Sequence, residues 1–137
     1  ASIHGCTKHA AEKLADILRK KGCKKVSITD LCREDIHEAV EDAFKYGKVV
    51  FAASSYDAGL FTPMYNFLHL LQAKTWQKRD AAIIENGSWA PSAAKVMTKM
   101  LLDMKNINIK GNTVTLRGVM KDSDIPALEA LADEILA

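Results

Sequence analysis

The chain has 137 residues, of which 48% are hydrophobic and 26% are charged, and its formal net charge is +2. This length and composition are typical of one globular domain with a substantial buried core. A net charge so close to zero argues against a nucleic-acid partner or an anionic membrane surface.

The cysteines and apolar segments favour a reducing, aqueous compartment. Cys6, Cys23 and Cys32 are odd in number and show no Cys-x-x-Cys spacing, so neither a zinc site nor a disulfide framework is indicated. No apolar run reaches the roughly 18 residues that cross a bilayer, and no signal peptide is recognisable. We therefore expect a cytoplasmic location and no membrane partner.

Helical and strand patterns alternate along the first half of the chain. After a turn at residues 2–7, apolar residues repeat at helical spacing from Ala11 to Leu18, and this helix is expected to end near Gly22. A short strand at residues 24–31 and a helix at residues 36–44 follow. The apolar run at residues 48–54 is too short for a helix, so we expect a strand buried on both faces.

The second half continues the alternation. A helix over residues 64–71 has Pro63 in its first turn, where proline is favourable. We then expect a buried strand at residues 80–85, a helix at residues 93–104, a strand at residues 112–118 and a last helix at residues 128–135. Such alternation predicts a parallel sheet covered by helices on both faces.

The turn before the first helix suggests that a strand should precede it. We therefore expect a first strand immediately before Ala1, outside the given sequence. With that strand, the prediction is a flavodoxin-like three-layer α/β/α domain whose parallel sheet has the order 2-1-3-4-5. Residues 1–137 would form this domain in the C-terminal part of a longer chain.

Three loops are expected at one rim, because ligands of doubly wound folds bind beyond the carboxyl ends of the strands. They read SIHGCT, SSYDAGLFTP and ENGSWAPS. In the first loop, Ser2, Gly5 and Thr7 precede a helix whose backbone N–H groups suit a phosphate, although helix capping alone is the alternative. Tyr56 and Trp89 in the other two loops are flat side chains suited to enclose a flat heterocycle.

These loops resemble those of the FMN-binding domain of flavodiiron proteins, also called A-type or diflavin flavoproteins. The resemblance implies FMN as the cofactor, with Trp89 as the principal stacking partner. The cofactor-binding residues that it implies are Ser2, Ile3, His4, Gly5, Cys6 and Thr7 in the phosphate loop, Ser55, Tyr56, Asp57, Ala58 and Gly59 in the second loop, and Asn86, Gly87, Ser88 and Trp89 in the third.

The chain departs from the family pattern at four places, one of which is the unusual Cys6 in the phosphate loop. Ala53, Ser54 and Ser55 stand where the family has Ser-Pro-Thr, and Asn86 stands where it has Ser. Asp57 replaces the usual Asn, and its carboxylate would lower the reduction potential of a flavin beside it.

The resemblance implies an electron-transfer domain with no catalytic or metal-binding residues of its own, which leaves its classification as an enzyme open. In the family, the flavin receives electrons from rubredoxin or an NAD(P)H reductase. It passes them to a diiron centre in a metallo-β-lactamase-like domain of the same protein or its dimer partner, and that centre reduces O2 or NO. The four histidines, His4, His9, His37 and His69, show no HxExD-type spacing, so iron ligands are expected outside this chain.

Three alternatives stay open at this stage. One is a stand-alone flavodoxin or an NAD(P)H:quinone reductase-like flavoprotein, although flavodoxins are typically acidic. A second is a signalling receiver domain, which lacks support because no acidic residue follows the strand at residues 48–54 directly. The third is an interaction module of this fold without flavin. Whether the chain forms homo-oligomers also stays open.

Overall fold

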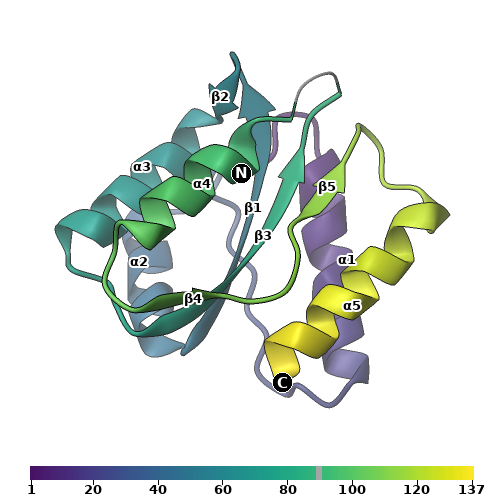
Figure 1. The fold of residues 1–137 in the computed structure, drawn as a ribbon, viewed down its shortest axis with the longest axis horizontal. Helices are drawn as coiled ribbons and strands as arrows, with labels where there is room; N and C mark the ends of the chain where they lie inside the picture. The colour runs from purple at the N-terminus through teal and green to yellow at the C-terminus, as the bar shows by residue number, and fades with distance from the viewer. Residues whose placement is uncertain (89–90) are drawn as a thin grey trace.

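The chain forms one sheet between two layers of helices (Figure 1). The computed structural model describes residues 1–88 and 91–137. Its helices are α1 (Cys6–Lys20), α2 (Ile36–Lys45), α3 (Thr62–Ala73), α4 (Ala93–Leu102) and α5 (Ile125–Leu136), with a short 3-10 turn at Asp122–Asp124. Its strands are β1 (Lys48–Tyr56), β2 (Gly59–Leu60), β3 (Arg79–Asn86), β4 (Ile107–Ile109) and β5 (Val114–Leu116). The predicted three-layer α/β/α class is confirmed.

The sheet is built around β1 and β3, which run parallel with Phe51 opposite Ile83. On the outer side of β3, β4 pairs with its first residues and β5 with its last, so β4 and β5 form one interrupted strand. β2 is a short antiparallel arm on the end of β1. The parallel strands therefore end at one rim, where the chain turns into loops.

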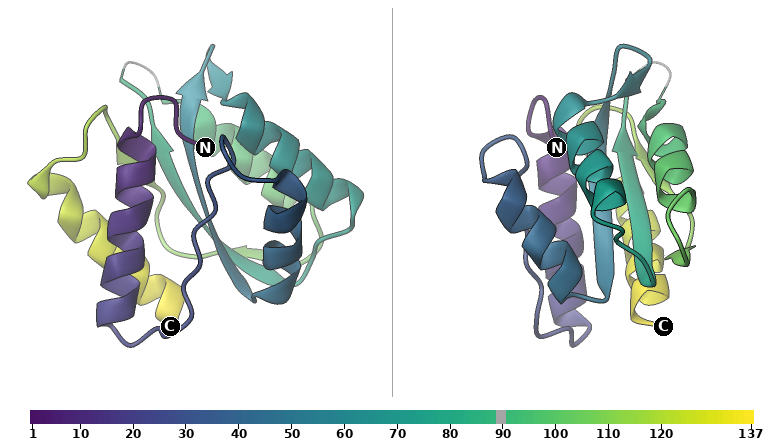
Figure 2. Two further views of the ribbon diagram at one scale, coloured as in Figure 1. Left: turned by 180° about the vertical axis from the view of Figure 1, so that it is seen from behind. Right: turned by 90° about the vertical axis from the view of Figure 1, so that its left-hand side faces the viewer.

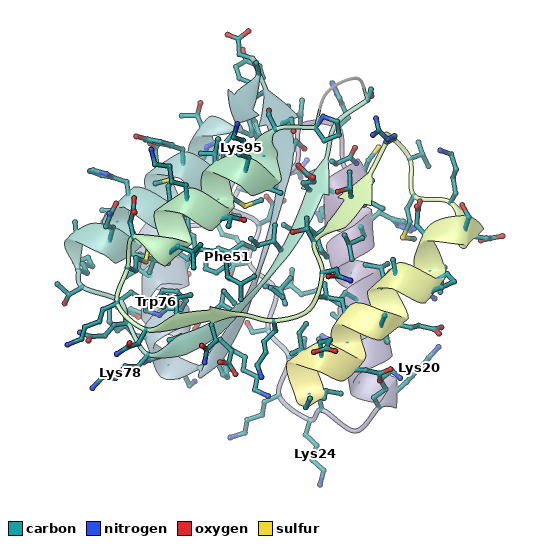
Figure 3. All side chains as sticks on the ribbon, in the orientation of Figure 1. Lys20, Lys24, Phe51, Trp76, Lys78 and Lys95 are labelled. Carbon is teal, nitrogen blue, oxygen red and sulfur yellow. The ribbon has the colours of Figure 1, made fainter. Side chains whose placement is uncertain are left out.

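The two faces of the sheet bury separate groups of side chains. Ala82 and Ile84 pack under α1 and α5, while Ala81 and Ile83 pack under α2, α3 and α4. β3 is thus buried on both faces, as its apolar run predicts. On the second face, Trp76 contacts the ring of Phe51 edge-on, with 5.8 Å between the ring centroids, and its Nε1 donates to the carbonyl of Ala43 in α2. Figure 3 labels both aromatic side chains in the interior, with Lys20 and Lys24 at the periphery.

The segment that follows α1 differs from the prediction. Residues 23–30 run as extended chain between α1 and α2, without the ladder of a strand (Figure 2). In the predicted order this strand pairs only with the first strand, so within residues 1–137 it has no neighbour to bond to. Its apolar side chains stay partly open to solvent, and Ile28 is 40% exposed.

Two short strands were not predicted, namely β2 and β4. Each pairs with a longer strand and has no alternating pattern long enough to recognise in the sequence. Within the described ranges, no helix has the length and apolar character needed to cross a membrane.

Candidate functional site

The turn before α1 leaves the first backbone N–H groups of that helix without a side-chain cap. Gly5, the residue before the helix, has a φ of 84°, in the left-handed region that glycine adopts without strain. The first turn of α1 holds no acidic side chain and no side-chain cap. The positive end of the helix dipole is therefore available to an anion.

Hydroxyl groups line this turn on the side of β1. Thr7 is buried, and its Oγ1 lies 3.0 Å from Oγ of Ser54 at the carboxyl end of β1. Ser54 Oγ also accepts a long hydrogen bond of 3.4 Å from the backbone N–H of Ile3. Two hydroxyls share one hydrogen bond here, so one hydroxyl proton is left for another acceptor.

Ser2 carries the one buried side-chain polar atom without a hydrogen-bond partner among the described residues. A buried hydroxyl without a partner is unfavourable by about 1–3 kcal/mol. An oxygen-rich anion at the start of α1 would satisfy the open helix N–H groups, and Ser2 in the preceding turn offers a further hydroxyl. The residues present therefore fit a phosphate at this end of the site.

The second loop is largely a β-hairpin rather than irregular chain. β1 continues to Tyr56, which pairs with Gly59 of β2, and the two residues between them have positive φ, 53° for Asp57 and 58° for Ala58. Two positive φ values correspond to the tight type I′ turn that joins hairpin strands. The turn holds Tyr56 at the end of the strand, where its side chain is 54% exposed and its ring lies 5.9 Å from that of Phe61.

Ser55 points to the opposite side of β1 from Ser54 and holds α4 in place. Its Oγ accepts from the backbone N–H groups of Ser92 and Ala93, at 2.8 and 3.0 Å. A Cβ at Gly87 would lie 3.1 Å from this oxygen and 3.0 Å from Pro91 Cα, so glycine is needed there for close packing. The Ser55 hydroxyl thus caps a helix, and any contact from this residue to a flavin would come from its backbone.

Asn86 at the end of β3 holds the loop that follows β5. Its Nδ2 donates to the carbonyl of Gly118 at 2.8 Å, and its Oδ1 accepts from the N–H of Gly118 at 2.9 Å. The side chain is buried, and both ends of its amide are used. Asn86 therefore brings residues 117–120 to the rim, a fourth loop that the sequence analysis did not include.

Glu85 is a second rim residue that was not predicted from the sequence. Its carboxylate is buried and accepts from the N–H of Ala94 at 3.0 Å and from Thr115 Oγ1 at 2.7 Å. Together with Ser55, it occupies the first N–H groups of α4. Side chains of the protein therefore accept from the first N–H groups of α4, whereas the first N–H groups of α1 have no side-chain cap.

The other predicted residues are described here in turn, except Trp89, which the structure does not describe. His4 and Ser88 are exposed, and Cys6 is a free, half-buried thiol in the first turn of α1. Trp89, the predicted stacking residue, lies outside the described residues. In the described ranges, no group of three or more His, Cys, Asp or Glu side chains is placed to hold a metal ion.

The loops predicted to meet do meet. Hydrogen bonds join the α1 turn to β1, join β1 to the start of α4, and join Ser92 Oγ to the carbonyl of Gly59 in β2. All of these contacts lie at the carboxyl ends of the parallel strands, at the upper edge of the molecule in Figure 1. Ser54 is the connecting residue that the prediction missed, and the alternation of side chains along β1 is the signal that separates it from Ser55.

No family model matches the sequence, and no curated protein matches it significantly. Solved structures do match the fold. Rubredoxin oxygen:oxidoreductase from Desulfovibrio gigas superposes over 98% of this chain and 33% of its own, with a TM-score of 0.91 and 19% identity. The flavodiiron protein from Giardia intestinalis superposes over 97% of this chain and 33% of its own, with a TM-score of 0.82 and 20% identity.

A smaller protein matches over most of its own length. Flavodoxin 1 from Bacillus cereus superposes over 98% of this chain and 92% of its own, with a TM-score of 0.82 and 13% identity. The chain thus spans about a third of the two larger proteins and nearly the whole of the flavodoxin. At these identities the likeness concerns the fold. The chain has the flavodoxin-like fold shared by flavodoxins and by part of the flavodiiron proteins.

Proposed function

We propose that this chain is an FMN-binding electron-transfer domain. The observation that carries the proposal is the open N-terminus of α1 beside the partnerless Ser2 Oγ, at the carboxyl-end rim of a flavodoxin-like sheet. Backbone N–H groups of residues 5–8 and the Ser2 hydroxyl would bind the phosphate of FMN, with no positively charged side chain required. When bound, FMN supplies reversible one-electron and two-electron transfer.

The ring system would lie over the neighbouring loops. Tyr56 offers an exposed aromatic face there, and Trp89 comes three residues after the end of β3 in the sequence. Because the side chains of Ser55 and Asn86 are used inside the protein, polar contacts to the ring would come from the backbone of residues 55–59 and 86–88. Aromatic stacking contributes about 0.5–1.5 kcal/mol per pair beyond the area that it buries.

For the partners, we propose a reductase or rubredoxin as electron donor and a diiron domain as acceptor. Support comes from the flavodiiron proteins, in which a domain of this fold makes up a third of the chain, and from the name of the Desulfovibrio gigas protein, which includes rubredoxin. In this arrangement the present chain positions the flavin, and O2 or NO is reduced elsewhere.

A self-contained flavodoxin is the second candidate. The match over 92% of the Bacillus cereus flavodoxin favours it, because that protein carries the fold without a further domain of comparable size. The gene sequence upstream of the codon for Ala1 separates the two candidates. A metallo-β-lactamase-like reading frame supports the flavodiiron arrangement, and a start codon a few residues upstream supports the flavodoxin.

A titration with FMN tests the binding proposal. Flavin fluorescence should be quenched as the protein is added, with saturation at one FMN per chain. Ser2→Ala should weaken FMN binding about 10- to 150-fold, the equivalent of one hydrogen bond to a charged group. The matched control is Ser123→Ala, which removes an exposed hydroxyl in the turn before α5 and should leave the affinity unchanged. A folded protein that does not quench FMN would instead support the interaction module without flavin.

A further inference from the structure

Glu85 is the one charged side chain that is buried among residues 1–88 and 91–137, with an exposure of only 7%. Charged side chains are almost never buried unless an opposite charge pairs with them, because burial removes their hydration. Both groups that donate hydrogen bonds to this carboxylate are neutral, namely the N–H of Ala94 at 3.0 Å and the hydroxyl of Thr115 at 2.7 Å. A buried charge held by neutral donors calls for an explanation.

Capping of α4 explains the hydrogen bonds of this carboxylate but not its charge. The positive end of the helix dipole favours a negative group by only about 0.3–1 kcal/mol. Ser55 Oγ already accepts from the two N–H groups that precede Ala94 N. A glutamine at position 85 could make the same two bonds, because its oxygen would accept from Ala94 N and its amide would donate to Thr115 Oγ1. The negative charge is therefore more than the fold requires.

The carboxylate lies next to the segments proposed to contact the flavin ring. Glu85 immediately precedes residues 86–88 and lies opposite Ala53 in the parallel register of β1 and β3. Ser55 is two residues beyond Ala53, so its side chain is on the same face of the sheet as that of Glu85. Both side chains bind N–H groups at the start of α4, which Figure 1 shows at the same edge as the ends of β1 and β3. The buried charge therefore adjoins both proposed ring-binding segments, residues 55–59 and 86–88.

We propose that the buried charge of Glu85 lowers the reduction potential of FMN bound at this rim, by favouring the oxidised form over the reduced form. This inference rests on the proposed function. Uptake of two electrons and one proton gives FMN one additional negative charge, and a fixed carboxylate nearby repels that charge. Because protein surrounds Glu85, dissolved salt screens its charge much less than that of an exposed residue such as Asp57 at the tip of the hairpin.

The test measures how much more tightly the chain binds one redox form of FMN than the other. Potentiometric titration of the FMN-loaded chain with dithionite and redox dyes, compared with the same titration of free FMN, gives the ratio of the affinities for reduced and oxidised FMN. Glu85→Gln should raise this ratio about 10-fold, as expected for one charge acting at an intermediate dielectric constant. A tenfold change corresponds to about 30 mV for a two-electron couple.

Three further variants separate the charge of Glu85 from its structural role. Thr115→Val removes one hydrogen bond to the carboxylate but keeps the charge, so it should lower the stability without raising the ratio. Asp103→Asn removes an exposed carboxylate at the other end of α4 and should leave the ratio unchanged. The double variant Glu85→Met with Thr115→Val removes the charge together with its hydroxyl partner, and it should raise the ratio as much as Glu85→Gln does. It takes the place of Glu85→Gln if that variant does not fold.

Salt provides a second readout that a purely structural role of Glu85 would not produce. The rise caused by Glu85→Gln should persist in about 0.5 M NaCl, whereas any rise caused by Asp57→Asn should shrink. The inference is overturned if this salt concentration abolishes the rise, or if Thr115→Val raises the ratio equally. It is also overturned if the ratio stays unchanged in Glu85→Gln and in the double variant, or if neither of them folds. A chain that binds oxidised FMN in these cases keeps the proposed function, whereas a chain that binds neither form of FMN overturns both.

Discussion

The pair of hydrogen bonds between Asn86 and Gly118 predicts a large effect from a small substitution. Asn86→Ala removes both bonds, of 2.8 and 2.9 Å, from a side chain that is only 7% exposed. Each such bond contributes about 1 kcal/mol net, so the free energy of unfolding should fall by about 2 kcal/mol. For a chain of this size, that corresponds to a fall in melting temperature of roughly 5–10 °C.

Urea denaturation followed by circular dichroism measures this loss, with Asn108→Ala as the control. Asn108 makes one exposed bond of 3.4 Å to Asp80, so its removal should change the free energy of unfolding by less than about 0.5 kcal/mol. Asn86→Asp should be no more stable than Asn86→Ala at neutral pH, because it places a carboxylate oxygen against the carbonyl of Gly118. Equal stability of Asn86→Ala and the unmodified chain would refute the assignment of Asn86 as the residue that holds this loop.

Three further predictions address the turn, the hydroxyl pair and the N-terminus. Ala58→Gly should raise the free energy of unfolding by about 0.5–1 kcal/mol, because glycine adopts a φ of 58° without strain. The control, Ala127→Gly in α5, should lower the free energy of unfolding by about 1 kcal/mol. A lower stability of Ala58→Gly would contradict the turn assignment. Thr7→Val keeps the shape of a buried residue but removes its hydrogen bond to Ser54, so the free energy of unfolding measured in urea should fall by about 1–2 kcal/mol. An unchanged urea midpoint would contradict a stabilising hydrogen bond between Thr7 and Ser54. The pKa of the Ala1 ammonium is lowered in the folded chain, so between the folded pKa and the usual value the unfolded chain binds more protons than the folded chain. The melting temperature should therefore rise with pH through this window, and the rise should be smaller when Ala1 is acetylated. Identical pH profiles of the two chains would contradict the burial of this amine.

Elements whose apolar pattern is long enough to define one face could be predicted from the sequence. The repeats of α1, α3 and α5 place Leu14, Leu68 and Leu131 in the core, where each is nearly fully buried. The runs in β1 and β3 were recognisable because they are apolar, short and rich in β-formers. In these segments, local preference and tertiary packing favour the same structure.

Strands that depend on a neighbour could not be predicted in the same way. Residues 23–30 have the composition of a strand, but a strand needs a ladder, and these residues form none with the described part of the chain. The β1–β2 hairpin was missed for another reason. Asp57 and Ala58 occupy a turn that usually contains Asn-Gly, so the sequence carries no turn signal there.

For the site, the sequence indicated which loops take part but not which contacts each side chain makes. The three loops, of which the turn before α1 is the first, lie together at one rim as predicted. Ser54 and Ser55 look equivalent in the sequence, yet alternation along β1 directs one to Thr7 and the other to the start of α4. The roles of Glu85 and Asn86 depend on residues about 30 positions away in the chain, which no local pattern reveals.

The central claim is that the α1 turn binds the phosphate of FMN, and a comparison of FMN with riboflavin tests it most directly. The two flavins share the ring system and differ in the phosphate. We predict that FMN binds at least about 100-fold more tightly, because the helix N-terminus and Ser2 have no partner in riboflavin. Equal affinity for the two flavins, or binding of neither by the folded protein, would contradict the account.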